Sequence, residues 1–341
     1  MAYTNFPNGV TSFGVPLPSQ SNMLSAMWST SYFVDVTYGL DGNDGVSPDS
    51  PLATVTRAIA VAQTATAQKT LGSVIFVRDR KWTANTSDPL NYSESGMVVP
   101  LALQGLHLLG TGPNQQNPWS VQIKGGSTAA ILTVRAPNVV IENLDFNRGS
   151  STAGHIVFKS DGTVGTITEM ASGVAVVNCH LRNSNQSTTG AITIDGVWFA
   201  NVEGCYFTNC RVGVLSKTSA DTCLAHVIRG NHFDVSTTDS GANIDAHYAF
   251  SGGPAYSMAF IGNDMVGPLP AVSGGTYLRF ISLTGINRGL VAGNTFPQVG
   301  ALLTFGATGS GGKVPVNVGF VNNWQERTAS ADADSQPIFR T

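Results

Sequence analysis

Residues 260–265 read Phe-Ile-Gly-Asn-Asp-Met, and this pattern of an apolar run, a glycine or asparagine and a closing apolar residue returns along the chain. The copies are Val139–Phe146, Ala175–Leu181, Val202–Phe207, Val227–Phe233, Phe260–Met265, Val291–Phe296 and Phe320–Trp324, with a looser one at Leu106–Gly110. The asparagines of the last four copies are 32, 31 and 29 residues apart. A repeat of this size with irregular length is typical of a coiled solenoid, in which length variation falls in loops.

The recurring asparagines have a physical reason to occupy the turns of such a solenoid. Asparagine and glycine tolerate the left-handed backbone that a sharp bend requires, and stacked amides can bond along the axis. The predicted turn ladder consists of Asn231, Asn263, Asn294 and Asn323. Hairpin turns of a β-sandwich would also use these residues, but a sandwich needs turns every 8–12 residues. The spacing therefore favours an all-β parallel β-helix.

Composition agrees with strands joined by tight turns and excludes several classes of protein. Charged residues make up 11% of the chain, about half the usual share, and there are 38 glycines. The net charge of −3 without a clustered basic face argues against a nucleic-acid partner, and no apolar run is long enough for a membrane span. Residues 1–20 lack the features of a signal peptide. The four cysteines are expected to be buried thiols.

We divide the chain into four segments. Residues 1–30 are an extended N-terminal arm anchored by Phe6, Phe13 and Leu17, for which a disordered terminus is the alternative. Residues 31–97 hold an entry strand, a short capping helix from Val55 with apolar residues at helical spacing, and the first turns. Residues 98–328 form the parallel β-helix, and residues 329–341 are a C-terminal tail.

The stretch Tyr38–Ala60 resembles the entry motif of pectate-lyase-like β-helix proteins. Pro51, Ala53 and Thr54 match a "P-x-A-T" step that follows a Gly/Asp-rich loop and leads into a capping helix. The resemblance implies a right-handed parallel β-helix with a covered N-terminal end, and it says little about chemistry. A cover is also a physical need, because a solenoid end exposes unpaired strand edges.

The opening stretch, MAYTNFPNGVTSFGVPLP, resembles the start of tailed-bacteriophage virion proteins. The resemblance implies a homotrimeric capsid decoration (cement) protein, located in the virion and assembled in the host cytoplasm. Its arm would dock on the major capsid protein or a tail component. The alternative is a tailspike or fibre β-helix that binds or cleaves host surface polysaccharide, and a third option is a passive carbohydrate-binding module.

Aligned copies place five polar residues at one position in successive turns, so that they project to one face: Asp145, His180, Tyr206, His232 and Asp264. Asp145, His180, His232 and Asp264 are the candidate catalytic residues, because glycosidases use two carboxylates about 5–9 Å apart. Alternation along a strand predicts a solvated polar face equally well, so we assign no catalytic residue.

The sequence predicts no metal and no cofactor. Asp145, His180 and His232 are separated by whole turns, and their spacing is not diagnostic of a metal site. Asp41, Asp44 and Asp49 cluster in the entry loop, where a turn-stabilising role is expected. No phosphate-binding loop, nucleophile elbow or zinc-protease motif is present in the sequence.

Overall fold

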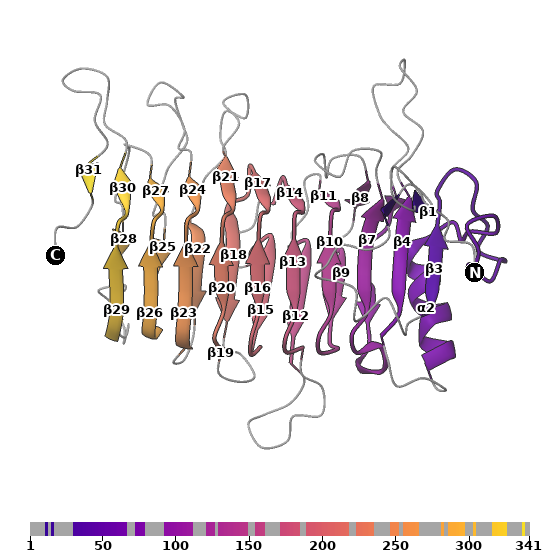
Figure 1. Ribbon diagram of the computed structural model, residues 1–341, viewed down its shortest axis with the longest axis horizontal. Helices are drawn as coiled ribbons and strands as arrows, with labels where there is room; N and C mark the ends of the chain where they lie inside the picture. Colours follow the sequence, from indigo (N-terminus) through magenta and orange to yellow (C-terminus); the bar gives the residue numbers. More distant parts are fainter. Residues whose placement is uncertain are drawn as a thin grey trace, which may run out of the picture.

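The described strands stack into a right-handed parallel β-helix whose rungs follow one another along the long axis (Figure 1), which confirms the predicted fold. The computed structural model describes residues 11–12, 15–16, 30–66, 72–78, 92–111, 121–126, 129–148, 154–160, 171–184, 189–217, 223–234, 246–251, 255–265, 281–282, 286–296, 303–304, 316–325 and 336–337. Three parallel sheets form the walls of the coil within this part of the chain.

Each sheet takes one strand from each turn. Sheet 1 contains β3 (Ser31–Val34), β4 (Val74–Arg78), β7 (His107–Thr111), β10 (Val140–Glu142), β13 (Ala175–Val177), β16 (Asn201–Glu203), β20 (Val227–Arg229), β23 (Ala255–Ile261), β26 (Ile286–Ala292) and β29 (Val316–Val321), and β19 (Cys223–Leu224) also pairs with β23. Sheet 2 contains β5 (Tyr92–Ser93), β8 (Gln122–Gly125), β11 (Asp145–Arg148), β14 (His180–Arg182), β17 (Tyr206–Thr208), β21 (His232–Asp234), β24 (Asp264–Met265), β27 (Thr295–Phe296) and β30 (Trp324–Gln325). Sheet 3 contains β6 (Met97–Val99), β9 (Leu132–Val134), β12 (Ile156–Lys159), β15 (Ile192–Asp195), β18 (Val212–Lys217), β22 (Ala246–Ser251), β25 (Ile281–Ser282) and β28 (Leu303–Thr304).

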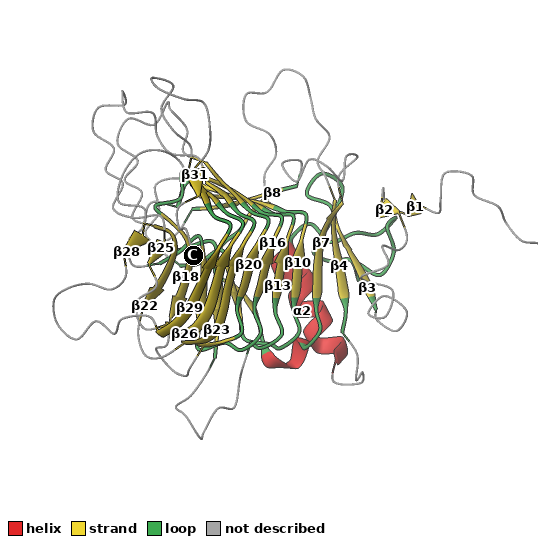
Figure 2. Ribbon diagram, turned by 60° about the vertical axis from the view of Figure 1, so that its left-hand side comes forward, coloured by secondary structure: helices red, strands yellow, loops and turns green. Residues whose placement is uncertain are grey.

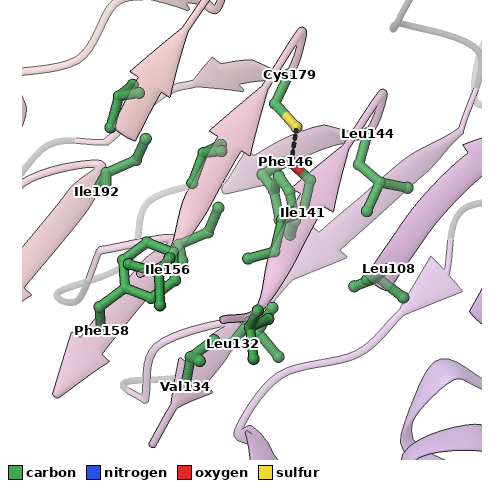
Figure 3. Packing of buried hydrophobic residues seen from close by; sticks show 14 of the residues in the cluster. Leu108, Leu132, Val134, Ile141, Leu144, Phe146, Ile156, Phe158, Cys179 and Ile192 are labelled. Carbon is green, nitrogen blue, oxygen red and sulfur yellow. Dashed lines mark hydrogen bonds between the residues drawn. The ribbon is translucent and has the colours of Figure 1, made fainter. Parts of the chain in front are cut away.

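Alternate residues of all three sheets point inward, and their apolar side chains form a core that runs through the middle of the coil (Figure 3). Like residues stack on like: the rings of Phe207 and Phe233, on neighbouring rungs of sheet 2, lie 4.5 Å apart and nearly parallel. Ile141, Phe146 and Phe158 enter the same core from sheets 1, 2 and 3. Burial of this apolar column is the main favourable contribution to folding.

The predicted capping helix is present as α2 (Val55–Thr66), which packs against β3, β4, β6 and the short 3-10 helix η1 (Leu101–Leu103). Its first turn is capped from two places. The backbone N–H groups of Val55 and Thr56 donate to the carboxylate of Glu94 over 2.8 and 2.7 Å, and Arg57 N–H donates to Thr54 Oγ1 over 3.1 Å. Figure 1 shows α2 beside β3 at the N-terminal end of the coil, and Figure 2 shows the same helix in red behind the stacked strands. The helix therefore covers that end and leaves none of these donors unpaired.

The entry loop folds around Asp41, whose carboxylate accepts from the backbone N–H groups of Ala53 and Thr54 over 3.0 Å. Asp44 Oδ1 accepts from Val46 N–H over 3.2 Å, so the bonds support the expected turn-stabilising role for Asp41 and Asp44.

The two ends of the chain are described only in small parts. Near the N-terminus β1 (Thr11–Ser12) pairs antiparallel with β2 (Val15–Pro16), and the predicted anchors Phe6, Phe13 and Leu17 lie outside the described residues. At the other end β31 (Gln336–Pro337) pairs antiparallel with β30. Within the described ranges, no helix has the length and apolar character needed to span a membrane.

Candidate functional site

The corner between sheets 1 and 2 contains the predicted asparagine ladder. Nδ2 of Asn231, Asn263 and Asn294 each donates to Oδ1 of the next asparagine, over 2.9, 3.0 and 2.8 Å, and the series ends at Asn323. Each Oδ1 above Asn231 also accepts the backbone N–H of the asparagine one rung below. All four side chains are buried. The ladder therefore satisfies corner groups that have no strand partner.

We expected these asparagines both to bond along the axis and to adopt the left-handed backbone of the bend, and only the first expectation is confirmed. Asn231, Asn263, Asn294 and Asn323 do not adopt the left-handed backbone. The residue before each of them does, with φ of 61°, 61°, 63° and 49° at Gly230, Gly262, Gly293 and Asn322. In each turn one residue therefore makes the bend and the next residue makes the hydrogen bonds. The bonding side chain must point into the coil, so the residue before it takes the left-handed backbone.

Cysteines continue the ladder column toward the N-terminus. Cys179 and Cys205 take the ladder position in their turns, and their thiols donate to the backbone oxygens of Ile141 and Val176. The asparagines make the equivalent bond, as Asn231 Nδ2 does to Val202 O over 3.0 Å. Burial raises the pKa of the Cys205 thiol to about 12, so it stays protonated and is a poor nucleophile. These cysteines are structural, as the sequence predicted.

The outer face of sheet 2 carries the candidate site. The register pairs Asp145 with His180, His180 with Tyr206, Tyr206 with His232 and His232 with Asp264, so the five aligned residues form one column. The alternating inward residues, such as Phe146 and Phe233, are core. The structure divides this column into a buried part and an exposed part.

The buried part surrounds Asp145, which is inaccessible although it points outward. Its carboxylate accepts from Gln122 Nε2 over 2.7 Å and from Arg182 Nε over 3.1 Å, so the guanidinium of Arg182 lies over it. His180 Nε2 bonds Thr208 Oγ1 over 2.9 Å. A buried carboxylate that is paired with a guanidinium and hydrogen-bonded in this way stabilises the fold, so we assign Asp145 a structural role.

The chemistry of His180 argues against a role as general base. Burial, with the nearby positive charge of Arg182, lowers the pKa of His180 to about 3, so the imidazole is neutral near pH 7. A general base works best with a pKa near the operating pH. Asp145 Oδ1 lies 3.6 Å from His180 Nδ1, which is too long for a hydrogen bond.

The exposed part begins at Tyr206. The rings of Tyr206 and His232 are stacked, with centroids 4.6 Å apart. Each ring bonds an acid from the rung above: Tyr206 Oη donates to Asp234 Oδ2 over 3.0 Å, and His232 Nδ1 bonds Asp264 Oδ2 over 2.8 Å. The side chains of His232 and Asp264 are 31% and 51% exposed. Burial and the adjacent carboxylate of Asp234 raise the pKa of Tyr206 to about 12, so its hydroxyl remains a neutral donor.

Trp324 belongs to the same column, which sequence alignment of the repeats missed. The register pairs Asp264 with Thr295 and Thr295 with Trp324, so Trp324 takes the outward position in the last copy. Trp324 is 44% exposed. We call Tyr206, His232, Asp234, Asp264 and Trp324 the sheet 2 strip.

The candidate acids Asp145 and Asp264 are not a catalytic pair. Four rungs separate them, which is about 19 Å at the spacing of neighbouring strands. Glycosidase carboxylates lie within about 9.5 Å of each other. Among the residues that the structure describes, no group of three or more metal-binding side chains gathers in one place.

Comparison with known proteins identifies no family. No family model and no curated protein matches the chain. Among solved structures it is similar to a pectin methylesterase from Aspergillus niger, with a TM-score of 0.48, 14% identity, and 89% of this chain and 87% of that chain covered. It is also similar to the catalytic domain of a GH87 α-1,3-glucanase in complex with tetrasaccharides (TM-score 0.44, 12% identity, 88% and 56% covered). A third is pectate lyase Pel9A (TM-score 0.40, 12% identity, 86% and 78% covered). At these values the similarity concerns the fold alone and does not extend to activity.

Proposed function

We propose that this protein binds an extended polysaccharide along the sheet 2 strip, as a fibre- or tailspike-type β-helix would. The observation that carries the proposal is the in-register row from Tyr206 to Trp324, which crosses five neighbouring strands. Its polar tips are hydroxyl, imidazole and carboxylate groups that can bond sugar hydroxyls, and Trp324 adds an aromatic surface. A linear row suits a linear polymer better than a compact small molecule.

Binding is favoured over cleavage by the arrangement of the titratable groups. Asp145 and His180 are buried and engaged with Gln122, Arg182 and Thr208. Asp264 is too far from Asp145 to serve as its partner across a glycosidic bond. The accessible polar groups of the strip are therefore best suited to recognition.

Calorimetric titration with a panel of soluble polysaccharides tests this function. We expect saturable binding by the unmodified chain, and a loss of about tenfold or more in affinity for His232→Ala and Asp264→Ala. Asp195→Asn on sheet 3 is the matched control and should bind normally. Absence of binding to every polymer would contradict the proposal. New reducing ends or unsaturated products that disappear in His232→Ala would replace it with a catalytic function.

We infer a structural virion role as the second candidate, favoured by a separate observation. The C-terminal half of sheet 1 exposes apolar side chains, with Leu290 and Val321 at 38% and 45%. Such surfaces suit assembly with other protein subunits. In this hypothesis deletion of residues 1–20 leaves a folded oligomer that no longer binds the particle. Particle binding at unchanged affinity after the deletion would contradict it.

A further inference from the structure

The outer face of sheet 1 changes character along the axis. In its middle it carries Asn201, Glu203 and Arg229, and Arg229 Nη2 donates to Glu203 Oε2 over 2.6 Å. One outward column is apolar from β20 onward, and a second outward column is apolar from β23 onward. One column is Val227, Ala259 and Leu290, and the other is Ile261, Ala292 and Val321. These strands lie side by side in the C-terminal half of the coil (Figure 1). We call these six residues the apolar face.

The corner between sheets 3 and 1 extends the apolar face sideways. Trp198 pairs with Leu224, and Leu224 pairs with Tyr256, so the three form a column that begins in the turn of β16 and runs beside the apolar face at Leu224 and Tyr256. Trp198 and Tyr256 are each 36% exposed, and the neighbouring Phe199 is 56% exposed. Three exposed aromatic residues at one end of an exposed aliphatic face are unusual on a chain that stays alone in water.

Phe199 is also held in a conformation that an aromatic residue rarely adopts. Its φ is 57°, and Ala225, Ser257 and Arg288 have φ of 52°, 58° and 66° at the equivalent place in later turns. At the opposite corner the same backbone is built with glycine and asparagine. The left-handed conformation costs about 1–2 kcal/mol for a residue with a side chain. Because successive turns share this backbone, the strain belongs to the corner, and the exposure of the Phe199 ring on that corner is what indicates a contact outside the isolated chain.

We propose that a second copy of this chain covers the apolar face and its aromatic corner, with the two solenoids side by side. The composition is that of a homo-oligomer interface, which is rich in aliphatic and aromatic residues and arginine and poor in acids. The rim carries both signs of charge, with Glu203 and Arg229 at one end and the exposed Arg288 at one side. The surface is therefore more complementary to a second copy of itself than to a highly charged partner. Another copy has the same strand spacing, so its rungs match these rungs along the whole face. The sheet 2 strip lies on another wall and stays accessible.

Light scattering coupled to size exclusion, over a wide range of concentrations, tests the proposal. We expect the unmodified chain to have a mass of at least two copies, and the double variant Leu290→Glu/Val321→Glu to have the mass of one. Val98→Glu on β6 is the matched control, because Val98 is 42% exposed on sheet 3, and it should keep the unmodified mass. Far-UV circular dichroism checks that each variant is folded.

A second variant keeps the test valid if the double variant does not fold. Phe199→Asn suits the left-handed backbone and removes the ring, so it should weaken self-association by about tenfold while raising the Tm of the monomer. A single-copy mass of the unmodified chain at every concentration would overturn the proposal. Unchanged self-association in both folded variants would overturn it too, as would binding of another partner to the apolar face of a monomeric chain.

Discussion

The side-chain amide of Asn263 donates to Oδ1 of Asn294 over 3.0 Å, although 31 residues separate them. The same Nδ2 donates to Ile228 O over 3.0 Å, and Asn263 Oδ1 accepts from the backbone N–H of Asn231. A single buried side chain therefore holds three successive rungs together at the corner. Because the bonds repeat at each rung, the ladder fixes the vertical register of the C-terminal half of the coil.

Replacing Asn263 should strongly destabilise the protein. Asn263→Ala removes the side-chain partners of Ile228 O and Asn231 N–H and one bond of the Asn231 amide, which we expect to cost about 3 kcal/mol in the free energy of unfolding. Chemical denaturation measures the change. Asn201→Ala, on the outer face of sheet 1, is the control and should cost about 0.5 kcal/mol or less. Equal effects of the two substitutions would contradict the ladder.

A side chain at the glycine before a ladder asparagine should lower the free energy of unfolding because of the backbone conformation alone. Gly262 has φ of 61°, and a Cβ at this position would meet no atom within 4 Å. Gly262→Ala should therefore cost about 1–2 kcal/mol through the left-handed backbone, without any clash. Gly262→Asn should cost less, since asparagine occupies the equivalent position 322. A smaller loss for alanine than for asparagine, measured by denaturation, would show that strain is not the cause.

The capping helix should depend on Glu94, which is 39 residues away from Val55. Glu94→Ala removes the acceptor of two N–H groups and a negative charge at the helix N-terminus, so we expect a loss of about 2 kcal/mol. Thermal unfolding and the helical signal of circular dichroism report it. Asp49→Ala in the entry loop is an exposed control that should change little. Comparable losses in the two variants would mean that capping is not what Glu94 contributes.

Acid should weaken the fold through His226. This ring is buried between Ser216 Oγ at 3.0 Å and Val197 O at 2.7 Å, and burial lowers its pKa to about 4. A histidine with a lowered native pKa contributes stability that is fully present above about pH 6.5. That contribution is lost as the pH falls toward 4, and it amounts to about 3 kcal/mol.

Denaturation at pH 7 and pH 4.5 measures the effect of His226. The unmodified chain should lose stability on acidification, and His226→Gln should lose about 2 kcal/mol less over the same interval, although it is less stable at pH 7. Identical pH dependence of the two chains would show that His226 is not the titrating group.

The charge of the sheet 2 strip should determine which polysaccharides it accepts. Asp234 and Asp264 contribute carboxylates, and the described strands β17, β21, β24, β27 and β30 contain no lysine or arginine. Polygalacturonate should therefore bind more weakly than a neutral polymer of similar length, because like charges repel. The double variant Asp234→Asn/Asp264→Asn should reduce this difference about tenfold at low salt and less at high salt. Tighter binding of polygalacturonate by the unmodified chain would refute the selectivity.

Part of this structure followed from the spacing of the repeats. The period around Asn231, Asn263 and Asn294 predicts stacked turns, and alternation within each copy predicts that Phe146 and Phe233 point inward while Asp145 and His232 point outward. These features are readable because inward and outward positions alternate locally along a strand. Stacking then places equal positions of successive copies above one another.

Other features depended on residues that are distant in sequence. Arg182 covers Asp145 from the next rung, so an outward acid is buried, whereas Asp264 has no such cover from the described residues and is half exposed. Glu94 caps a helix that begins 39 residues earlier, and pairing with Thr295 gives Trp324 its outward position. The sequence by itself determined which side of each strand faces the core, because that depends on alternation within a few residues. Only the tertiary structure decided what lies over each outward side chain, because burial there depends on neighbours that the coil brings back after a full turn.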